Sequence, residues 1–341
     1  LQGGSTAAGV PHGKWAAPAG MLPPRLGRTC PGRRLEVTTT PMSAVNSYTL
    51  LDFRDEILAL EPDAVVIYAG HNEFRGVLGT GSAYSSGFSP ALTRLILSLR
   101  RSHIVEAAFQ LVGPDGDETS TARQGTLMAR IAGERSIANN SPLFAATERQ
   151  FRENLQRLLA GYADAGVPVF IGTLASNERD QQPFVSAPVP AAASEQWQTL
   201  EAATRQAMAR GRRDEAYRDA AALVRIHDPS ADAWYLLGQV AEADRRTEEA
   251  RHAYLAAKDR DQLRFRAPES FNDIIRTSAH ETGATVVDVQ SALAAAATGG
   301  IFGNDLMLEH LHPNLAGYFL LAVAVYAAMM AAAVGGPGAQ L

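Results

Sequence analysis

The sequence predicts an α/β fold: three α/β/α layers around a mostly parallel sheet, with an inserted hairpin of helical repeats. Continuous apolar runs at residues 63–70, 167–174 and 284–289 lack polar alternation, as strands buried on both faces do. Amphipathic helix patterns and short glycine turns separate these runs, which is typical of a doubly wound sheet. Helical spacing without strands over residues 197–259 predicts the insertion.

The elements follow one another at regular intervals. The predicted elements are, in chain order, helix 19–28, strand 34–40, helix 47–60, strand 63–70, helix 143–165, strand 167–174, helix 271–282, strand 284–289 and helix 315–334. The β-branched residues of 34–40 favour a strand. Pro62 and Gly166 end the helices before them, because proline cannot continue a helix and glycine is a common helix end.

The helical insertion interrupts the α/β domain, so the chain has three parts. Residues 1–190 form the first part of the α/β domain, residues 197–260 the helical insertion, and residues 261–341 the C-terminal part of the α/β domain. Within the first part the pattern weakens at about 76–140, where a helix is expected at 90–111. We interpret this stretch as a lid over the strand ends, with a long surface insertion as the alternative.

The insertion has the residue spacing of a tetratricopeptide repeat, in which small residues let two antiparallel helices approach closely. The matching residues are Trp234, Leu237, Gly238, Ala241, Ala250, Tyr254 and Ala257, and a degenerate copy precedes them. Two repeats are too few for a free-standing solenoid, so they must lean on another surface. The alternatives are a helical pair that only packs and a docking site for a protein or peptide partner.

Composition limits the classes of partner. The 341 residues are 46% hydrophobic and 20% charged, which is an ordinary globular composition. A net charge of −5 with scattered arginines excludes a nucleic-acid-binding face. The single cysteine, Cys30, excludes an internal disulfide and a cysteine-based metal cluster. The apolar run at 318–334 is short for a membrane span and is predicted to be a buried helix rather than a span.

The small residues of 3–9 (Gly-Gly-Ser-Thr-Ala-Ala-Gly) permit a sharp turn with an exposed hydroxyl. A strand-to-helix turn that carries a nucleophilic serine needs this, so Ser5 is the candidate nucleophile, with a plain loop as the alternative. Only Leu1 and Gln2 precede the turn as strand, so we expect Ser5 to be poorly anchored.

Two later motifs carry complementary side chains. Asn72 follows strand 63–70 and offers a side-chain N–H to a developing oxyanion; a turn or helix cap is its alternative role. Glu309 precedes His312 by three residues, so its carboxylate can hold the imidazole in the tautomer that accepts a proton from serine. Asp305 is a second candidate for the carboxylate. A metal site at Glu309, His310 and His312 is the competing interpretation.

These motifs resemble those of the SGNH/GDSL hydrolases. Gly-x-Ser-x-x-x-Gly, Gly-x-Asn-acid and acid-x-x-His-Pro occur in the order that the family has. Residues 68–74 (Tyr-Ala-Gly-His-Asn-Glu-Phe) and 309–314 (Glu-His-Leu-His-Pro-Asn) look like the bacterial branch that carries tetratricopeptide repeats inside the hydrolase domain. Residues 173–180 and 263–268 are similar to that branch too, so the resemblance covers nearly the whole chain.

The resemblance implies a flavodoxin-like SGNH fold and a serine esterase or acyltransferase without a cofactor or metal. It implies Ser5 as nucleophile, His312 as general base and then acid, and Glu309 as the residue that orients His312. Asn72 and the backbone N–H of Ser5 would form the oxyanion hole. The implied substrate is a small acyl ester, including esters on carbohydrate or cell-envelope glycan. The resemblance implies a bacterial protein, and the sequence leaves its compartment, cytoplasm or envelope, open.

Two departures from the family pattern bear on activity. Pro41 stands where the family has a glycine whose N–H completes the oxyanion hole, and proline has no N–H. Losing one donor costs about 3 kcal/mol of transition-state stabilisation unless the amide of Met42 substitutes. Glu309 stands where most of the family has aspartate. The alternative function is therefore a catalytically weak scaffold of this fold that binds a partner through its repeats.

Overall fold

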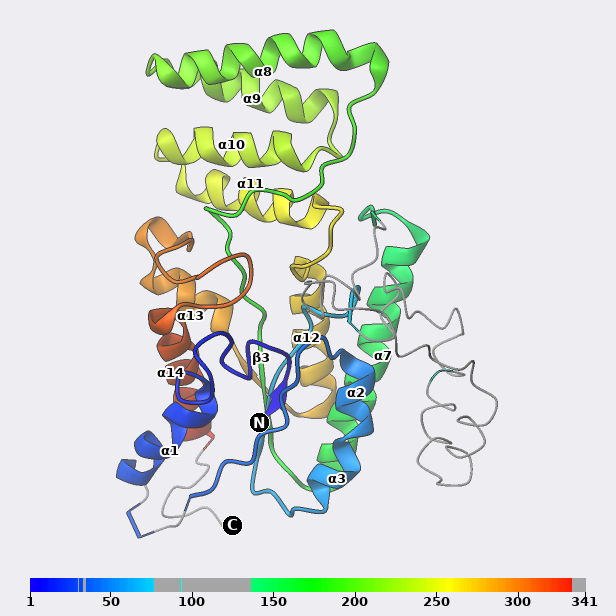
Figure 1. Ribbon diagram of the computed structural model, residues 1–341, viewed down its shortest axis with the longest axis vertical. Helices are drawn as coiled ribbons and strands as arrows, with labels where there is room; N and C mark the ends of the chain where they lie inside the picture. The colour runs from blue at the N-terminus through cyan, green and yellow to red at the C-terminus, as the bar shows by residue number, and fades with distance from the viewer. Residues whose placement is uncertain (30, 33–34, 77–92, 94–135, 333–341) are drawn as a thin grey trace, which may run out of the picture.

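The computed structural model describes residues 1–29, 31–32, 35–76, 93 and 136–332. Most of the lid predicted at about 76–140 lies outside the described residues, as does the helix expected at 90–111. In the described part, an α/β unit with a parallel sheet carries a separate layer of helices at one end (Figure 1).

Four parallel strands form the sheet, in the order β1, β2, β3, β4. They are β1 (Gln2–Gly3), β2 (Val65–Tyr68), β3 (Val169–Gly172) and β4 (Thr285–Val287). Every residue of β2 and β3 is buried, as their continuous apolar sequences predict for strands covered on both faces. The α/β class and the parallel sheet are therefore confirmed.

The strand predicted at 34–40 does not form over the described residues of that range. The chain there runs parallel to β1 instead, and Thr40 N–H donates to Leu1 O (3.0 Å) while Met42 N–H donates to Gly3 O (3.1 Å). Because β1 is only two residues long, this ladder is too short to make a regular strand.

This short ladder nevertheless shows where the order in which the chain adds strands to the sheet reverses. The chain leaves β1, runs along one of its edges, and then returns as β2 on the other edge. β1 is thus the switch point of the sheet. In open α/β sheets, ligands bind outside the carboxyl end of the strands at this point.

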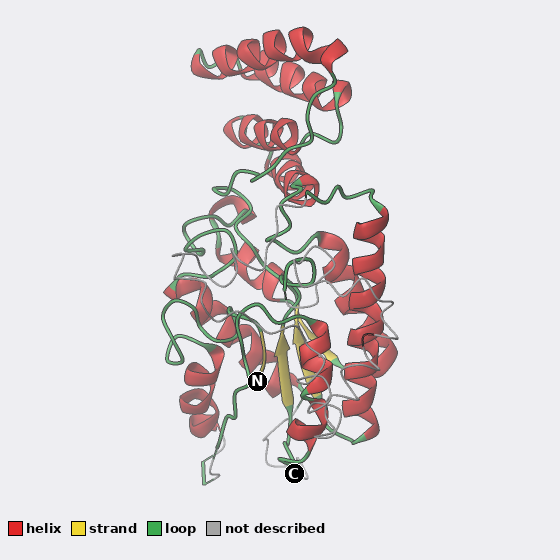
Figure 2. Ribbon diagram, turned by 45° about the vertical axis from the view of Figure 1, so that its right-hand side comes forward, coloured by secondary structure: helices red, strands yellow, loops and turns green. Residues whose placement is uncertain are grey.

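Helices cover both faces of the sheet, an arrangement compatible with three α/β/α layers (Figures 1 and 2). On one face lie α1 (Pro18–Thr29), α13 (Val289–Ala296) and α14 (Leu315–Ala331), and on the other lie α2 (Ser47–Asp52), α3 (Arg54–Leu58), α7 (Pro142–Asp164) and α12 (Glu269–Thr282). Short 3₁₀ turns lie at Ala191–Ala193 and Thr298–Gly300. One apolar core joins both helix layers to the strands.

Most predicted helices lie where they were expected, and the exception is residues 47–60. That stretch forms two helices that meet at Phe53, which ends the first and begins the second. The first of them starts at Asn46, whose side chain accepts the N–H of Tyr48 (3.2 Å) and so caps the helix.

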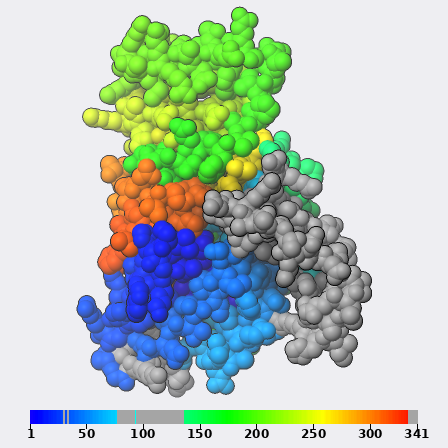
Figure 3. Space-filling view, in the orientation of Figure 1, coloured from blue at the N-terminus to red at the C-terminus, as the bar shows by residue number. Residues whose placement is uncertain are grey.

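Four helices between β3 and α12 form the separate layer, which Figures 2 and 3 show above the α/β unit. They are α8 (Ser194–Ala209), α9 (Arg213–Ile226), α10 (Ala231–Ala243) and α11 (Thr247–Arg260). Gly238 lets α10 and α11 approach closely, since a Cβ there would lie 2.7 Å from the Tyr254 ring. The predicted repeat spacing requires such an approach, while the repeat assignment itself stays a prediction.

The last helix covers the sheet, as predicted. α14 packs against β3, β4, α1 and α13, and it buries Tyr318 and Leu321. Within residues 1–332, as far as the structure describes them, no helix is both long and apolar enough to cross a bilayer.

Candidate active site

Ser5 lies in a turn that follows β1 directly, at the carboxyl end of the sheet. The chain coils at once, and Val10 N–H donates to Ser5 O (3.1 Å). The residue before the turn must be very small, because a Cβ on Gly3 would lie 2.2 Å from Tyr68 O of the neighbouring strand. Figure 3 shows this N-terminal segment lying against the segment around residue 300, which is far away in the sequence.

The short strand before Ser5 is fixed by its neighbours. The side chain of Gln2 donates to Leu50 O (3.2 Å) and accepts from the Tyr162 hydroxyl (2.9 Å), and Gln2 is 1% exposed. β1 also pairs with β2. Contrary to the expectation from sequence, Ser5 therefore follows a well-anchored strand.

Ser5, His312 and Glu309 form one continuous hydrogen-bonded chain. His312 Nε2 lies 2.7 Å from Ser5 Oγ, and His312 Nδ1 lies 2.5 Å from Glu309 Oε1. The same Glu309 oxygen accepts the backbone N–H of His312 (2.7 Å). Because an ionised carboxylate only accepts, the Nδ1 atom carries the proton and Nε2 is free to accept from the Ser5 hydroxyl.

The loop before α14 holds His312 in place. Met307 and Pro313 form an antiparallel bridge, and Leu308 N–H donates to the carbonyl of His312 (2.8 Å). Asp305, the second candidate for the carboxylate, accepts from Gly303 N–H (2.7 Å) within the same loop. In this geometry the partner of His312 is Glu309.

Glu309 lies between two histidines, because its second oxygen Oε2 pairs with His310 Nδ1. Burial disfavours its charge, but the hydrogen bonds from His310 and His312 outweigh burial and hold the pKa of Glu309 well below its ordinary value. The carboxylate is thus ionised whenever His312 acts. Among the described residues no cluster of three or more His, Cys, Asp or Glu side chains is arranged to hold a metal, so the metal alternative has no support.

Asn72 lies in the turn after β2, and the neighbouring Glu73 fixes that turn. The Glu73 carboxylate is fully buried and accepts the N–H (2.6 Å) and the hydroxyl (2.8 Å) of Ser47 at the start of α2. Burial, opposed by these hydrogen bonds, raises the pKa of Glu73 to about 7. The motif after β2 thus combines Asn72, which lies at the site, with Glu73, which ties the turn to α2.

Asn72 lies against the backbone beside the nucleophile. A Cβ on Gly4 would lie 3.2 Å from Asn72 Nδ2, so glycine at this position permits the close approach. No hydrogen bond occupies the Asn72 side chain within the part of the chain that the structure describes. Gly4, Ser5, His71 and Asn72 line a cavity of about 10 Å³, which has room for one atom the size of a water oxygen.

Met42 is poorly placed to substitute for the donor that Pro41 lacks. Its N–H is directed at Gly3 O (3.1 Å) and completes the ladder beside β1, so it is not available to an oxyanion. Pro41 has no N–H to offer. The backbone N–H of Ser5, in contrast, makes no hydrogen bond with the described residues.

Two more histidines lie beside the site: the sequence suggested His310 only as a metal ligand, and it indicated no role for His71. His310 pairs with Glu309, and its ring contacts those of Phe184 (5.4 Å between centroids) and Phe265 (5.6 Å) edge-on. His71, next to Asn72, is 7% exposed. Its place at the carboxyl end of a parallel strand was the signal that could have found it.

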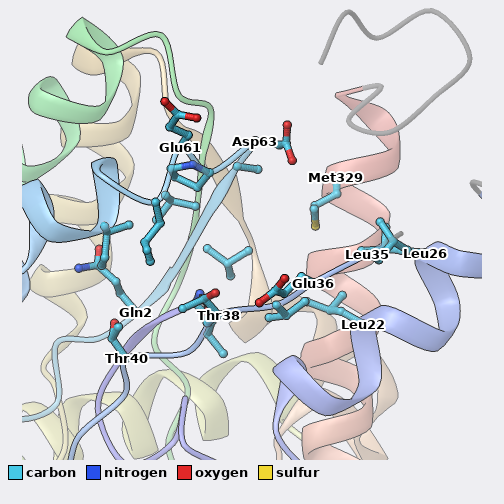
Figure 4. Close-up of a pocket in the computed structure, with 18 residues that line it drawn as sticks. Gln2, Leu22, Leu26, Leu35, Glu36, Thr38, Thr40, Glu61, Asp63 and Met329 are labelled. Carbon is cyan, nitrogen blue, oxygen red and sulfur yellow. Dashed lines mark hydrogen bonds between the residues drawn. The ribbon is translucent and has the colours of Figure 1, made fainter. Parts of the chain in front are cut away.

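A larger cavity, of about 380 Å³, lies at the opposite, amino end of the strands (Figure 4). Leu22 and Leu26 of α1, Met329 of α14 and the start of β2 line it, together with the acidic Glu36 and Asp63. Its lining includes no serine and no histidine. We therefore place the chemistry at the small cavity beside Ser5 and not at the larger one.

No protein-family model matches the chain, and no curated protein or solved structure is significantly similar to it. Its function is therefore inferred from the site geometry together with the sequence motifs.

Proposed function

We propose that the chain is a serine esterase or acyltransferase of the SGNH/GDSL type, acting on small acyl esters through an acyl-serine intermediate. The main observation that supports this proposal is the chain of contacts from Ser5 Oγ to His312 Nε2 (2.7 Å) and from His312 Nδ1 to Glu309 Oε1 (2.5 Å). A nucleophile within hydrogen-bond reach of a base, which is itself oriented by a third group, is the arrangement of nucleophilic catalysis. Its place at the switch point of the sheet supports the proposal.

Each step can be assigned to a group of this site. As Ser5 Oγ bonds to the ester carbonyl carbon, its proton passes to His312 Nε2, and the carbonyl π electrons move onto oxygen. Glu309 stabilises the imidazolium that results. When the tetrahedral intermediate collapses, the C–O bond to the leaving alcohol breaks, and His312 gives that oxygen its proton. Water or an acceptor hydroxyl then attacks the acyl-serine in the same way, and Ser5 is regenerated.

The developing oxyanion needs donors at the small cavity beside Ser5. The Ser5 backbone N–H and Asn72 Nδ2 are free of other hydrogen bonds among the described residues and are the first two candidates. The cavity accepts a single oxygen but no bulky group, which suits this role.

The test is hydrolysis of short p-nitrophenyl esters by the wild type and by Ser5→Ala. We expect the substitution to reduce kcat by a factor of at least about 10³, since residual catalysis would come from binding and the oxyanion hole alone. Ser194→Ala, a serine-to-alanine change at the start of α8, is the matched control and should leave kcat unchanged. Wild-type activity in the Ser5→Ala variant would refute the proposal.

A second candidate is a catalytically weak scaffold that binds a protein partner through α8–α11. It is favoured by the loss of the donors at Pro41 and Met42 and by a cavity of about 300 Å³ between α8 and α10. Trp197, Glu201 and Asp232 are among the residues that line this cavity. Covalent labelling with a fluorophosphonate separates the two candidates, because an activated serine reacts with the probe and an inert one does not.

A further inference from the structure

His71 is a buried polar side chain beside the nucleophile that the reaction steps above do not use. It lies between Gly70 and Asn72 at the carboxyl end of β2, is 7% exposed, and lines the small cavity together with Ser5 and Asn72.

The hydrogen bonds of the ring define its tautomer. His71 Nδ1 accepts the backbone N–H of Ala267 (3.2 Å). A nitrogen that accepts an N–H carries no proton, so in the neutral ring the proton is on Nε2. Nε2 is buried and has no hydrogen-bond partner among the described residues. The ring therefore offers an N–H that is unused in the free protein.

The environment keeps this ring neutral. Burial lowers the pKa of His71 to about 3, and the positive charge of Lys258 adds to the effect, while Glu309 opposes it. At neutral pH the ring thus cannot take the proton of Ser5 and compete with His312 as the base. It can only donate, through Nε2–H.

The oxyanion hole lacks one donor, and the Nε2–H of His71 would compensate for it. Pro41 has no N–H, and the N–H of Met42 is bound to Gly3 O (3.1 Å). A buried donor without a partner is costly, because it has lost its hydrogen bonds to water. An oxyanion formed in the cavity would restore the missing hydrogen bond in the transition state, and this is how preorganised donors accelerate acyl transfer.

We propose that His71 is a further catalytic residue, whose Nε2–H donates a hydrogen bond to the substrate oxyanion beside those of the Ser5 N–H and Asn72. This inference rests on the proposed acyl-transfer function. It assigns to a side chain the task that a backbone N–H at position 41 would otherwise perform.

Two substitutions separate a catalytic role from a structural one. In His71→Gln the side-chain amide nitrogen reaches the position of Nε2, so the donor is kept while the acceptor for Ala267 is lost. In His71→Asn the side-chain oxygen reaches the position of Nδ1, so the acceptor for Ala267 is kept while the donor is lost. Circular dichroism and urea unfolding show whether each variant is folded.

We expect His71→Asn to lower kcat for p-nitrophenyl acetate by about 10²- to 10³-fold with KM little changed, which is the usual effect of removing one oxyanion donor. His71→Gln should stay within about tenfold of the wild type. If His71→Asn retains full activity, or if His71→Gln is the more damaged variant, the ring anchors Ala267 and the inference is overturned.

Fluorophosphonate labelling distinguishes failure of this inference from failure of the proposed function. A wild type that is not labelled, and Ser5→Ala turnover equal to that of the wild type, would overturn both. Rapid labelling of the wild type, with equal labelling rates in the folded His71→Asn variant, would overturn the role of His71 alone. A labelling rate reduced at least tenfold in His71→Asn but not in His71→Gln would support it.

Discussion

Replacing Glu309 by glutamine tests the carboxylate of the catalytic chain, because the side chain keeps its shape and loses its charge. The amide oxygen can still accept the backbone N–H and Nδ1–H of His312, which both point at Oε1 (2.7 and 2.5 Å). The amide nitrogen can donate to His310 Nδ1, the partner of Oε2. We therefore expect the Glu309→Gln variant to fold normally.

The magnitude follows from the charge that His312 gains in the transition state. Two opposite unit charges about 4 Å apart attract each other by about 4 kcal/mol at an effective dielectric constant of about 20. Losing that attraction lowers the rate by a factor of about 10³, since each 1.36 kcal/mol is tenfold. Because the pKa of Glu309 is held well below its ordinary value, the wild-type carboxylate carries this charge throughout the neutral pH range in which the assay is run.

The assay is kcat/KM for a short p-nitrophenyl ester, measured beside urea unfolding of each variant. Asp305→Asn is the matched control, because Asp305 bonds to Gly303 N–H (2.7 Å) and not to His312. We expect it to retain activity within about threefold. A folded Glu309→Gln variant with wild-type kcat/KM would refute the assignment, and loss of activity in Asp305→Asn alone would mean that the carboxylate was misassigned.

Two further predictions concern the cavity beside Ser5. Gly4→Ala places a Cβ 3.2 Å from Asn72 Nδ2, so it should displace this donor and lower kcat about tenfold or more. Gly27→Ala, in helix α1, is the control, because a Cβ there meets only the Leu35 side chain at 3.9 Å. It should stabilise the fold by ~0.5–1 kcal/mol. The second prediction is that His71 makes the folded state less stable in acid, and urea unfolding at pH 8 and pH 5 tests it. At pH 5 folded His71, with its pKa of about 3, stays neutral, whereas unfolded histidine, at about 6.5, binds a proton. Stability is therefore lost as the pH falls from 6.5 toward 3, by about 2 kcal/mol at pH 5. The His71→Asn variant should lack that share of the loss, and an identical pH dependence in both proteins would contradict the prediction.

Local pattern was sufficient to predict the α/β class and most elements. β2 and β3 were predicted because continuous apolar runs suit strands buried on both faces. The strand expected at 34–40 failed, because a strand exists only through its partner, and β1 pairs with that segment over too few residues. The helix expected at 47–60 breaks at Phe53, where no proline or glycine marks the boundary.

The candidate site divides in the same way. The chemical types of Ser5, Asn72, Glu309 and His312 were recognisable in the sequence, because side chains that suit a nucleophile, a donor, a carboxylate and a base occur in the order of the family that the motifs resemble. Whether the N–H of Met42 could serve as a substitute donor was not readable from the sequence, since the direction of a backbone N–H depends on which strand lies beside it.

The sequence by itself determined that Ser5, Asn72, Glu309 and His312 are side chains that suit this chemistry. Only the tertiary structure decided which atoms meet. It brings Ser5 to His312 across 307 positions and turns His71 Nδ1 toward Ala267 across 196 positions, leaving Nε2 as a buried donor. The physical reason is that hydrogen bonds depend on distance and direction at the scale of an ångström, and contacts this far apart in the chain are set by packing.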